Sequence, residues 1–208
     1  MATGATAPPS TGRAGSRPRA MTASSASTIR PYASCAQSRP RAAGGPTASP
    51  ASLDGKVFEF SLKESLAKGP VVVYFYPSAF TGGCSLQAHT FAVNHEKFAA
   101  AGASIIGVSL DSIERLNDFS ADPEYCAGKI AVASDADGKI ARSYNLKVAN
   151  AKPGAKDSRG VEIGHGFAER TTFIVTPNGK IAATVGGVSP VENVTKSLEI
   201  VQQLAKKN

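Results

Sequence analysis

Cysteine is scarce in this sequence, with three thiols among 208 residues, at positions 35, 84 and 126. So few cysteines exclude a small fold held together by several disulfide bonds. Long apolar runs are also missing, and no stretch reaches the roughly 20 apolar residues that a membrane-spanning helix needs. The hydrophobic content of 42% nevertheless suits an ordinary globular core.

Acidic residues are absent from residues 1–53, which contain six arginines, seven prolines and nine serines. Such a segment buries too little apolar surface to offset the entropy of ordering it, so we expect a disordered leader. Its composition resembles an organellar transit peptide, which would place the protein in a plastid or mitochondrion rather than the cytoplasm. An over-extended start, with Met21 as the true first residue, and an artificial leader are equally compatible with it.

The formal net charge of +7 comes almost entirely from this leader. The other 155 residues carry the remaining 17 basic and all 16 acidic side chains. A balanced surface gives no electrostatic footprint for nucleic acid. We therefore expect one folded domain over 54–208 without a nucleic-acid partner. The lack of a long apolar run excludes a membrane partner as well, and we expect a monomer or homodimer.

Within 54–208, short apolar runs alternate with stretches of helical periodicity. We expect strands at 57–60, 71–76, 104–110, 130–133, 170–176 and 181–185, and helices at 62–67, 84–98, 113–122, 139–144 and 190–205. The strand at 71–76 is apolar throughout, as in a strand buried on both faces. Strand, helix and strand up to residue 110 predict a right-handed parallel crossover. The sequence thus predicts an α/β fold with a mixed central sheet flanked by helices.

Cys84 opens the predicted helix at 84–98, after a loop with two glycines. The first turn of a helix offers unpaired amides and the positive end of the helix dipole, and both favour thiolate over thiol. The apolar arc of this helix should contain two pairs of residues seven positions apart, Leu86 with Val93 and Phe91 with Phe98. A free cysteine is more often a small buried hydrophobe. Here the Thr81 hydroxyl could point at the sulfur, and Pro77 could line one side of a pocket around it.

The spacing Pro77-x-x-x-Thr81-x-x-Cys84, together with the apolar strand before it, resembles the active-site signature of the peroxiredoxins, nearest to their Q-type, bacterioferritin-comigratory-like subgroup. The resemblance extends over roughly 54–208 and implies a thioredoxin-like fold. It also implies that Cys84 attacks hydrogen peroxide or an organic hydroperoxide to give a sulfenic acid, without metal or cofactor. Thr81 and Gly83 would bind the peroxide, and Pro77 would shield the intermediate. One departure is Gln87, where many members carry glutamate.

Arg170 opens the predicted strand at 170–176, an unusual place for a charge unless its head group has a function. The resemblance assigns it to holding the thiolate and the peroxide; otherwise it is a surface arginine at a strand end. Glu169 could position the guanidinium or be solvated.

A second thiol must resolve the sulfenic acid before the Cys84 thiol can be regenerated. Q-type members often place one five residues after the first, where this chain has His89. Cys126 is the resolving candidate, which would require local unwinding if the two cysteines lie apart. Alternatively, Cys126 is a buried structural residue and an external thiol resolves. Thioredoxin, glutaredoxin or glutathione would then supply electrons.

Rival interpretations remain open. A redox-sensing or signalling module without efficient turnover is the main alternative to an enzyme. A metal site from Cys84, His89 and His95 is disfavoured, because these spacings place the side chains on different helix faces. The segment at 135–138 is interpreted as a turn rather than half of a calcium loop. Residues 146–168 form a long polar connection, typical of a binding loop or of local disorder. His165 within it could orient a substrate, but we expect it to be solvated.

Overall fold

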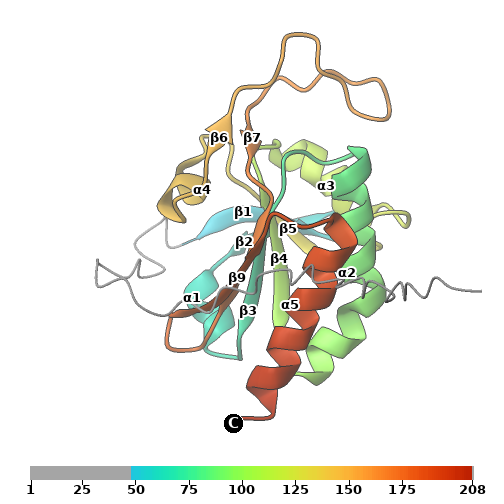
Figure 1. Ribbon diagram of the computed structural model, residues 1–208. Helices are drawn as coiled ribbons and strands as arrows, with labels where there is room; N and C mark the ends of the chain where they lie inside the picture. The colour runs from blue at the N-terminus through green and yellow to red at the C-terminus, as the bar shows by residue number, and fades with distance from the viewer. Residues whose placement is uncertain (1–47, 208) are drawn as a thin grey trace, which may run out of the picture.

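A mixed seven-stranded sheet runs through the centre of the computed structural model, which describes residues 48–207 (Figure 1). Its strand order is β2-β1-β5-β4-β3-β8-β9. The strands are β1 (Ser49–Leu53), β2 (Lys56–Phe60), β3 (Val71–Phe75), β4 (Ser104–Ser109), β5 (Ala131–Ser134), β8 (Thr171–Val175) and β9 (Ile181–Gly186). The strands β3, β4 and β5 are parallel, and the other pairings are antiparallel. The predicted mixed sheet is confirmed.

Helices cover both faces of this sheet (Figure 1). One face packs against α2 (Gly82–Ala100), α3 (Ile113–Ala121) and α5 (Pro190–Ala205). The other packs against the short helices α1 (Leu62–Leu66) and α4 (Lys139–Ser143). Alternate side chains of β3 enter the two cores, and all five of its residues are buried. The predicted elements are confirmed to within two residues at each end.

The apolar arc predicted for α2 is only half right. Phe91 and Phe98 are completely buried, whereas Leu86 and Val93 are 47% and 64% exposed. A spacing of seven keeps each pair on one side of a helix but does not place the two pairs on the same side. The buried side of α2 is completed instead by small and polar residues, Cys84, Gln87, Ala88 and Ala92.

The predicted domain start at residue 54 is also wrong. The strand β1 is an interior strand, paired with β2 on one side and β5 on the other. Ala51 and Ser52 are completely buried in it. Its sequence, Ser-Pro-Ala-Ser-Leu, shares the composition of the leader, so composition placed the boundary too late. The leader prediction for the preceding residues, with Met21 and Cys35, lies outside the described residues.

The long connection at 146–168 contains a short hairpin that sequence reasoning missed. Its strands are β6 (Val148–Ala149) and β7 (Phe167–Ala168), which pair antiparallel and bring the two ends of the connection together. In Figure 1 the residues between them project from the end of the sheet at which β3 and β4 finish. Among residues 48–207, no helix combines the length and apolar character needed to cross a membrane.

Candidate active site

Cys84 lies in the first turn of α2 and is only 2% exposed. The helix begins after Thr81, whose carbonyl accepts hydrogen bonds from the amides of Cys84 and Ser85 at 2.9 and 2.8 Å. The preceding amides, of Gly82 and Gly83, have no hydrogen-bond partner among the described residues. The sulfur therefore sits beside unpaired donors and the positive end of the helix dipole.

Arg170 reaches the sulfur from the residue before β8, 86 positions along the chain. Its Nη2 donates to Cys84 Sγ at 3.3 Å, and its Nη1 donates to the Gly83 carbonyl at 3.3 Å and to Gln87 Oε1 at 2.5 Å. Three acceptors on two nitrogens fix the orientation of the planar guanidinium, which a lysine ammonium could not reproduce. Glu169 is exposed, and no hydrogen bond or ion pair joins it to this guanidinium within the described part of the chain.

Gln87 supports the guanidinium from inside the core. Its side chain is completely buried, and its Nε2 donates to Asn193 Oδ1 at 3.0 Å. Asn193 is held in turn by the Thr172 hydroxyl, at 2.6 Å, and by the Val185 carbonyl, at 3.0 Å. This network leaves Gln87 Oε1 as the acceptor for Arg170. Because the partner is a neutral amide, the positive charge stays available to an anion at the sulfur.

The Thr81 hydroxyl does not point its proton at the sulfur. It donates instead to the Ser78 carbonyl at 2.8 Å, so that part of the expectation is wrong. The reason is the tight turn between these residues, in which Phe80 has a left-handed φ of +57°. The Thr81 oxygen is thereby left as an acceptor. Pro77 is half-buried two residues beyond β3, after the amide of Tyr76 makes a last bond to β4.

Cys126 lies in the turns after α3 and is completely buried in the same core as Cys84. Both thiols are free. Burial raises the pKa of the Cys126 thiol strongly, and the carboxylate of Asp122 raises it further. As folded, Cys126 is therefore a protonated thiol that is shielded from solvent.

The segment that carries Cys126 packs directly on the active-site loop. Tyr125 stacks on Phe119 and meets the ring of Phe80 edge-on, at centroid distances of 5.3 and 5.4 Å. His89 of α2 lies 3.1 Å from the Glu124 carbonyl through Nδ1. Opening this segment would thus also disturb the loop that leads to Cys84.

His165 is not solvated, which corrects the expectation from its loop context. Its side chain is 19% exposed, and Nε2 lies 2.8 Å from Oδ1 of the buried Asp111. Sequence reasoning missed Asp111 as a site residue, and the cap of α3 is Ser112. A signal was available, because Asp111 follows β4, and the carboxyl ends of parallel strands collect functional side chains.

The two histidines of α2 have separate partners. His89 contacts the Glu124 carbonyl, and His95 Nδ1 lies 4.0 Å from Glu96 Oε1. Among residues 48–207, no three histidine, cysteine or acidic side chains gather as metal ligands would. The segment at 135–138 is a turn, in which Asp135 accepts hydrogen bonds from the amides of Ile140 and Ala141, in the first turn of α4.

Comparisons with known proteins point to one family. The model of the AhpC/TSA family matches residues 46–184. Peroxiredoxin Q, chloroplastic, of Sedum lineare is 30% identical over 136 residues, which are 65% of this chain and 64% of that protein. Peroxiredoxin Bcp of Bacillus subtilis (strain 168) is 28% identical over 137 residues, which are 66% of this chain and 80% of that protein. The match thus spans just under two thirds of the first relative.

A solved structure gives the same picture. The bacterioferritin comigratory protein of Xanthomonas campestris, described for its alkyl peroxide reduction activity, superposes with a TM-score of 0.59 at 27% identity. The superposition covers 75% of this chain and 91% of that one. The predicted thioredoxin-like fold is therefore confirmed.

Proposed function

The chain belongs to the AhpC/TSA family, and we propose that it is a thiol peroxidase of the Q-type, Bcp-like peroxiredoxin kind, with Cys84 as the peroxidatic residue. The observation that carries the proposal is the contact between Arg170 Nη2 and Cys84 Sγ. Guanidinium, helix dipole and unpaired amides all act on one sulfur. Reactive cysteines are found in electropositive surroundings of this kind.

The first step is an in-line displacement. The Cys84 thiolate attacks one oxygen of the peroxide, so that an S–O bond forms and the O–O bond breaks. The thiol is oxidised by two electrons to a sulfenic acid, and the departing alkoxide or hydroxide takes a proton from solvent and leaves as alcohol or water. Hydrogen peroxide and organic hydroperoxides are both substrates in this proposal, supported by the alkyl peroxide reduction of the Xanthomonas protein.

The peroxide needs donors and an acceptor in fixed places. Arg170 donates to the peroxide oxygens as negative charge passes from sulfur to the leaving oxygen, an effect that grows toward the transition state. The unpaired amide of Gly83 provides a second donor. The Thr81 hydroxyl donates its hydrogen bond to the Ser78 carbonyl, and its oxygen is therefore the acceptor for the O–H group of the peroxide. Pro77 shields the sulfenic acid from a second oxidation.

A second thiol then resolves the sulfenic acid and releases water. Cys126 fills this role if its segment unwinds, and a thioredoxin, glutaredoxin or glutathione thiol fills it otherwise. The unperturbed fold disfavours direct attack by Cys126, because its thiol is buried and protonated. Named relatives come from a chloroplast and from bacteria, so the proposal covers an organellar or a cytoplasmic enzyme, as monomer or homodimer.

One equivalent of peroxide, followed by peptide mass spectrometry, tests this function. We expect the peroxide to be consumed stoichiometrically and Cys84 to carry either one added oxygen or a bond to Cys126. Unchanged thiols with unconsumed peroxide would contradict it. Stoichiometric oxidation without turnover under any of the three reductants would instead favour the redox-sensing module.

Gly83 gives a second test, because a Cβ atom there would make an unusually tight contact with the guanidinium of Arg170. An added Cβ would lie 3.2 Å from Arg170 Nη2 and 3.5 Å from Pro190 Cγ. We expect Gly83→Ala to shift the guanidinium and to slow the reaction of Cys84 with peroxide about tenfold, since small misplacements of catalytic groups cost large factors. Gly82→Ala is the matched control, because its Cβ meets nothing within 4 Å. Equal stopped-flow rates for the two variants would contradict the role of Arg170.

A further inference from the structure

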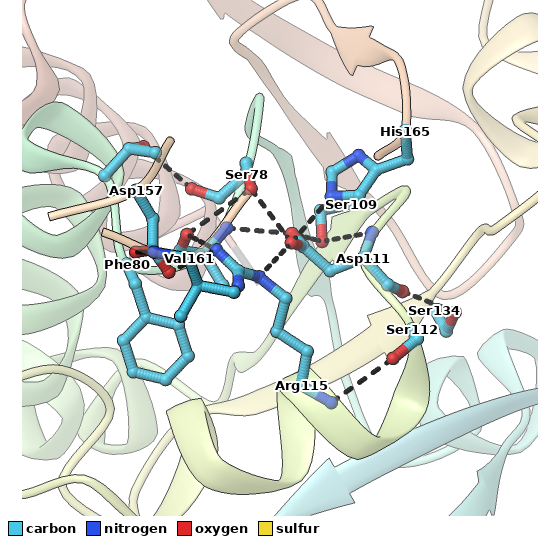
Figure 2. A network of polar contacts seen from close by, with 12 residues as sticks. Ser78, Phe80, Ser109, Asp111, Ser112, Arg115, Ser134, Asp157, Val161 and His165 are labelled. Carbon is cyan, nitrogen blue, oxygen red and sulfur yellow. Dashed lines mark hydrogen bonds and ion pairs between the residues drawn. The ribbon is translucent and has the colours of Figure 1, made fainter. Parts of the chain in front are cut away.

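Asp111, at the end of β4, has a completely buried carboxylate with five hydrogen-bond donors around it (Figure 2). Its Oδ2 accepts from the Ala79 amide at 2.8 Å and from the Ser109 hydroxyl at 2.7 Å. Its Oδ1 accepts from three further groups at 2.8 to 2.9 Å, Ser78 Oγ, Arg115 Nε and His165 Nε2. Two of the five donors thus belong to the loop that leads from β3 into α2.

That loop contains a strained residue. Phe80 has a φ of +57°, which is costly for a bulky side chain and persists only when its surroundings impose it. The Ala79 carbonyl accepts from Arg115 Nη2 at 2.9 Å, and the Phe80 carbonyl accepts from the amide and hydroxyl of Ser158 at 2.9 and 2.7 Å. Because Thr81 follows directly and caps α2, the conformation held here decides where the first turn of α2 points.

The loop is also held from a second side, by residues 157–166, which we call the strap. Asp157 is buried and accepts from Arg115 Nη2 at 2.8 Å, so that Arg115 bridges the two carboxylates of Asp111 and Asp157 (Figure 2). The guanidinium of Arg159 lies over the Phe80 ring, 3.2 Å from its centroid. The strap therefore covers the active-site loop and is attached to it through Asp111 and its partners.

His165 closes the strap at its other end and must carry a proton on both ring nitrogens to do so. Its Nε2 faces the Asp111 carboxylate and its Nδ1 faces the Gly166 carbonyl, each at 2.8 Å. Both partners are acceptors, so a neutral imidazole, which has one N–H, satisfies only one of them. The charged groups facing the ring within residues 48–207 are Asp111 and, from α3, Arg115. Phe167 of β7 meets the ring edge-on.

We propose that Asp111 is the positioning residue of the active-site loop. We also propose that the imidazolium of His165, by binding Asp111, holds the strap over that loop. The inference rests on the proposed peroxidase function only for its consequence, a well-aimed Cys84. Asp111 touches neither sulfur nor peroxide in this assignment. It acts through Ala79 and Phe80, which fix the start of α2.

Charge coupling supports the pairing. Burial alone would raise the pKa of Asp111, but hydrogen bonds from His165 and the Ala79 amide outweigh it, and the pKa is lowered. Burial alone would lower the pKa of His165, but its bonds to Asp111 and Gly166 outweigh it, and the pKa is raised above 6.5. The pair thus stabilises the fold most between these two values. The carboxylate contribution is lost as pH falls through the lowered pKa, and the imidazolium contribution as pH rises through the raised one.

The test compares Asp111→Asn with Asp135→Asn in the full chain. Asp135 is also a buried carboxylate, 3% exposed against 0% for Asp111, but it binds amides at the start of α4 rather than the active-site loop. The readout is the rate of alkylation of reduced Cys84 by iodoacetamide, followed on its own peptide by mass spectrometry. We expect Asp111→Asn to slow alkylation about tenfold and Asp135→Asn to change it less than about twofold, with both proteins still unfolding cooperatively.

His165→Gln supplies a readout that a merely structural role would not move. Glutamine can donate to Asp111 but does not titrate. We expect the ratio of wild-type to variant alkylation rates to be largest below pH 6.5 and to approach one as pH rises through the raised pKa of His165. A pH-independent ratio, wild-type rates in Asp111→Asn, or equal slowing in Asp135→Asn would each overturn the proposal. Alkylation requires no peroxide, so these outcomes are separate from a failure of the peroxidase function.

Discussion

Cys84→Ser leaves a folded protein that reduces no peroxide above background. A serine hydroxyl is not ionised near neutral pH and is a poor nucleophile without an adjacent base, whereas the thiolate is strong by itself. Removing the nucleophile of a covalent enzyme costs several powers of ten, so we expect a loss of about a thousandfold or more in the second-order rate constant with peroxide. Following peroxide consumption in the presence of excess thiol reductant measures this directly.

Cys126→Ala is the matched control for this result. It removes the other buried thiol of the described residues without touching the contact between Arg170 and Cys84. We expect the first oxidation to proceed at nearly the wild-type rate, while the buried cavity lowers the free energy of unfolding by about 1 kcal/mol. Peroxide consumption by Cys84→Ser at the wild-type rate would refute the assignment of the nucleophile. Loss of the first oxidation in Cys126→Ala, with the fold intact, would move the chemistry to the other thiol.

The sequence predicted most of the fold because local signals and packing agree in its central part. The five buried residues of β3, the helix after Cys84 and the hairpin of β8 and β9 each combine a clear period with turn residues at their ends. The strand β1 was missed because it lacks such a signal. Its partners on both sides, β2 and β5, make it a strand, and these lie elsewhere in the chain.

The candidate site divides in the same way. The spacing of Pro77, Thr81 and Cys84 is local and could be read from the chain, and Arg170 was found through its odd place at the start of a strand. The pairing of Asp111 with His165 could not be found so, because it joins residues 54 positions apart across a loop without periodicity. The residues next to a histidine in such a loop do not indicate whether its side chain faces solvent or a buried carboxylate.

Arg170→Lys keeps a positive charge near the sulfur but loses the planar fork. A lysine ammonium cannot donate at once to Cys84 Sγ, the Gly83 carbonyl and Gln87 Oε1, which the guanidinium does. We expect the rate constant with peroxide to fall about a hundredfold, the scale of losing one aimed donor in a catalytic site. Stopped-flow measurement of a single turnover gives this number without interference from the reductant.

The unfolding free energy of Arg170→Lys separates a catalytic role of the guanidinium from a structural one. Gln87 is completely buried, so losing the guanidinium leaves its Oε1 poorly satisfied and costs about 1 to 2 kcal/mol of unfolding free energy. Arg142→Lys, at an exposed position of α4, is the control for the same exchange away from the site and should change neither rate nor stability. If Arg170→Lys loses this unfolding free energy but keeps the wild-type rate with peroxide, the guanidinium has a structural role and no catalytic one. The thiolate would then owe its reactivity to the amides and the dipole of α2 alone.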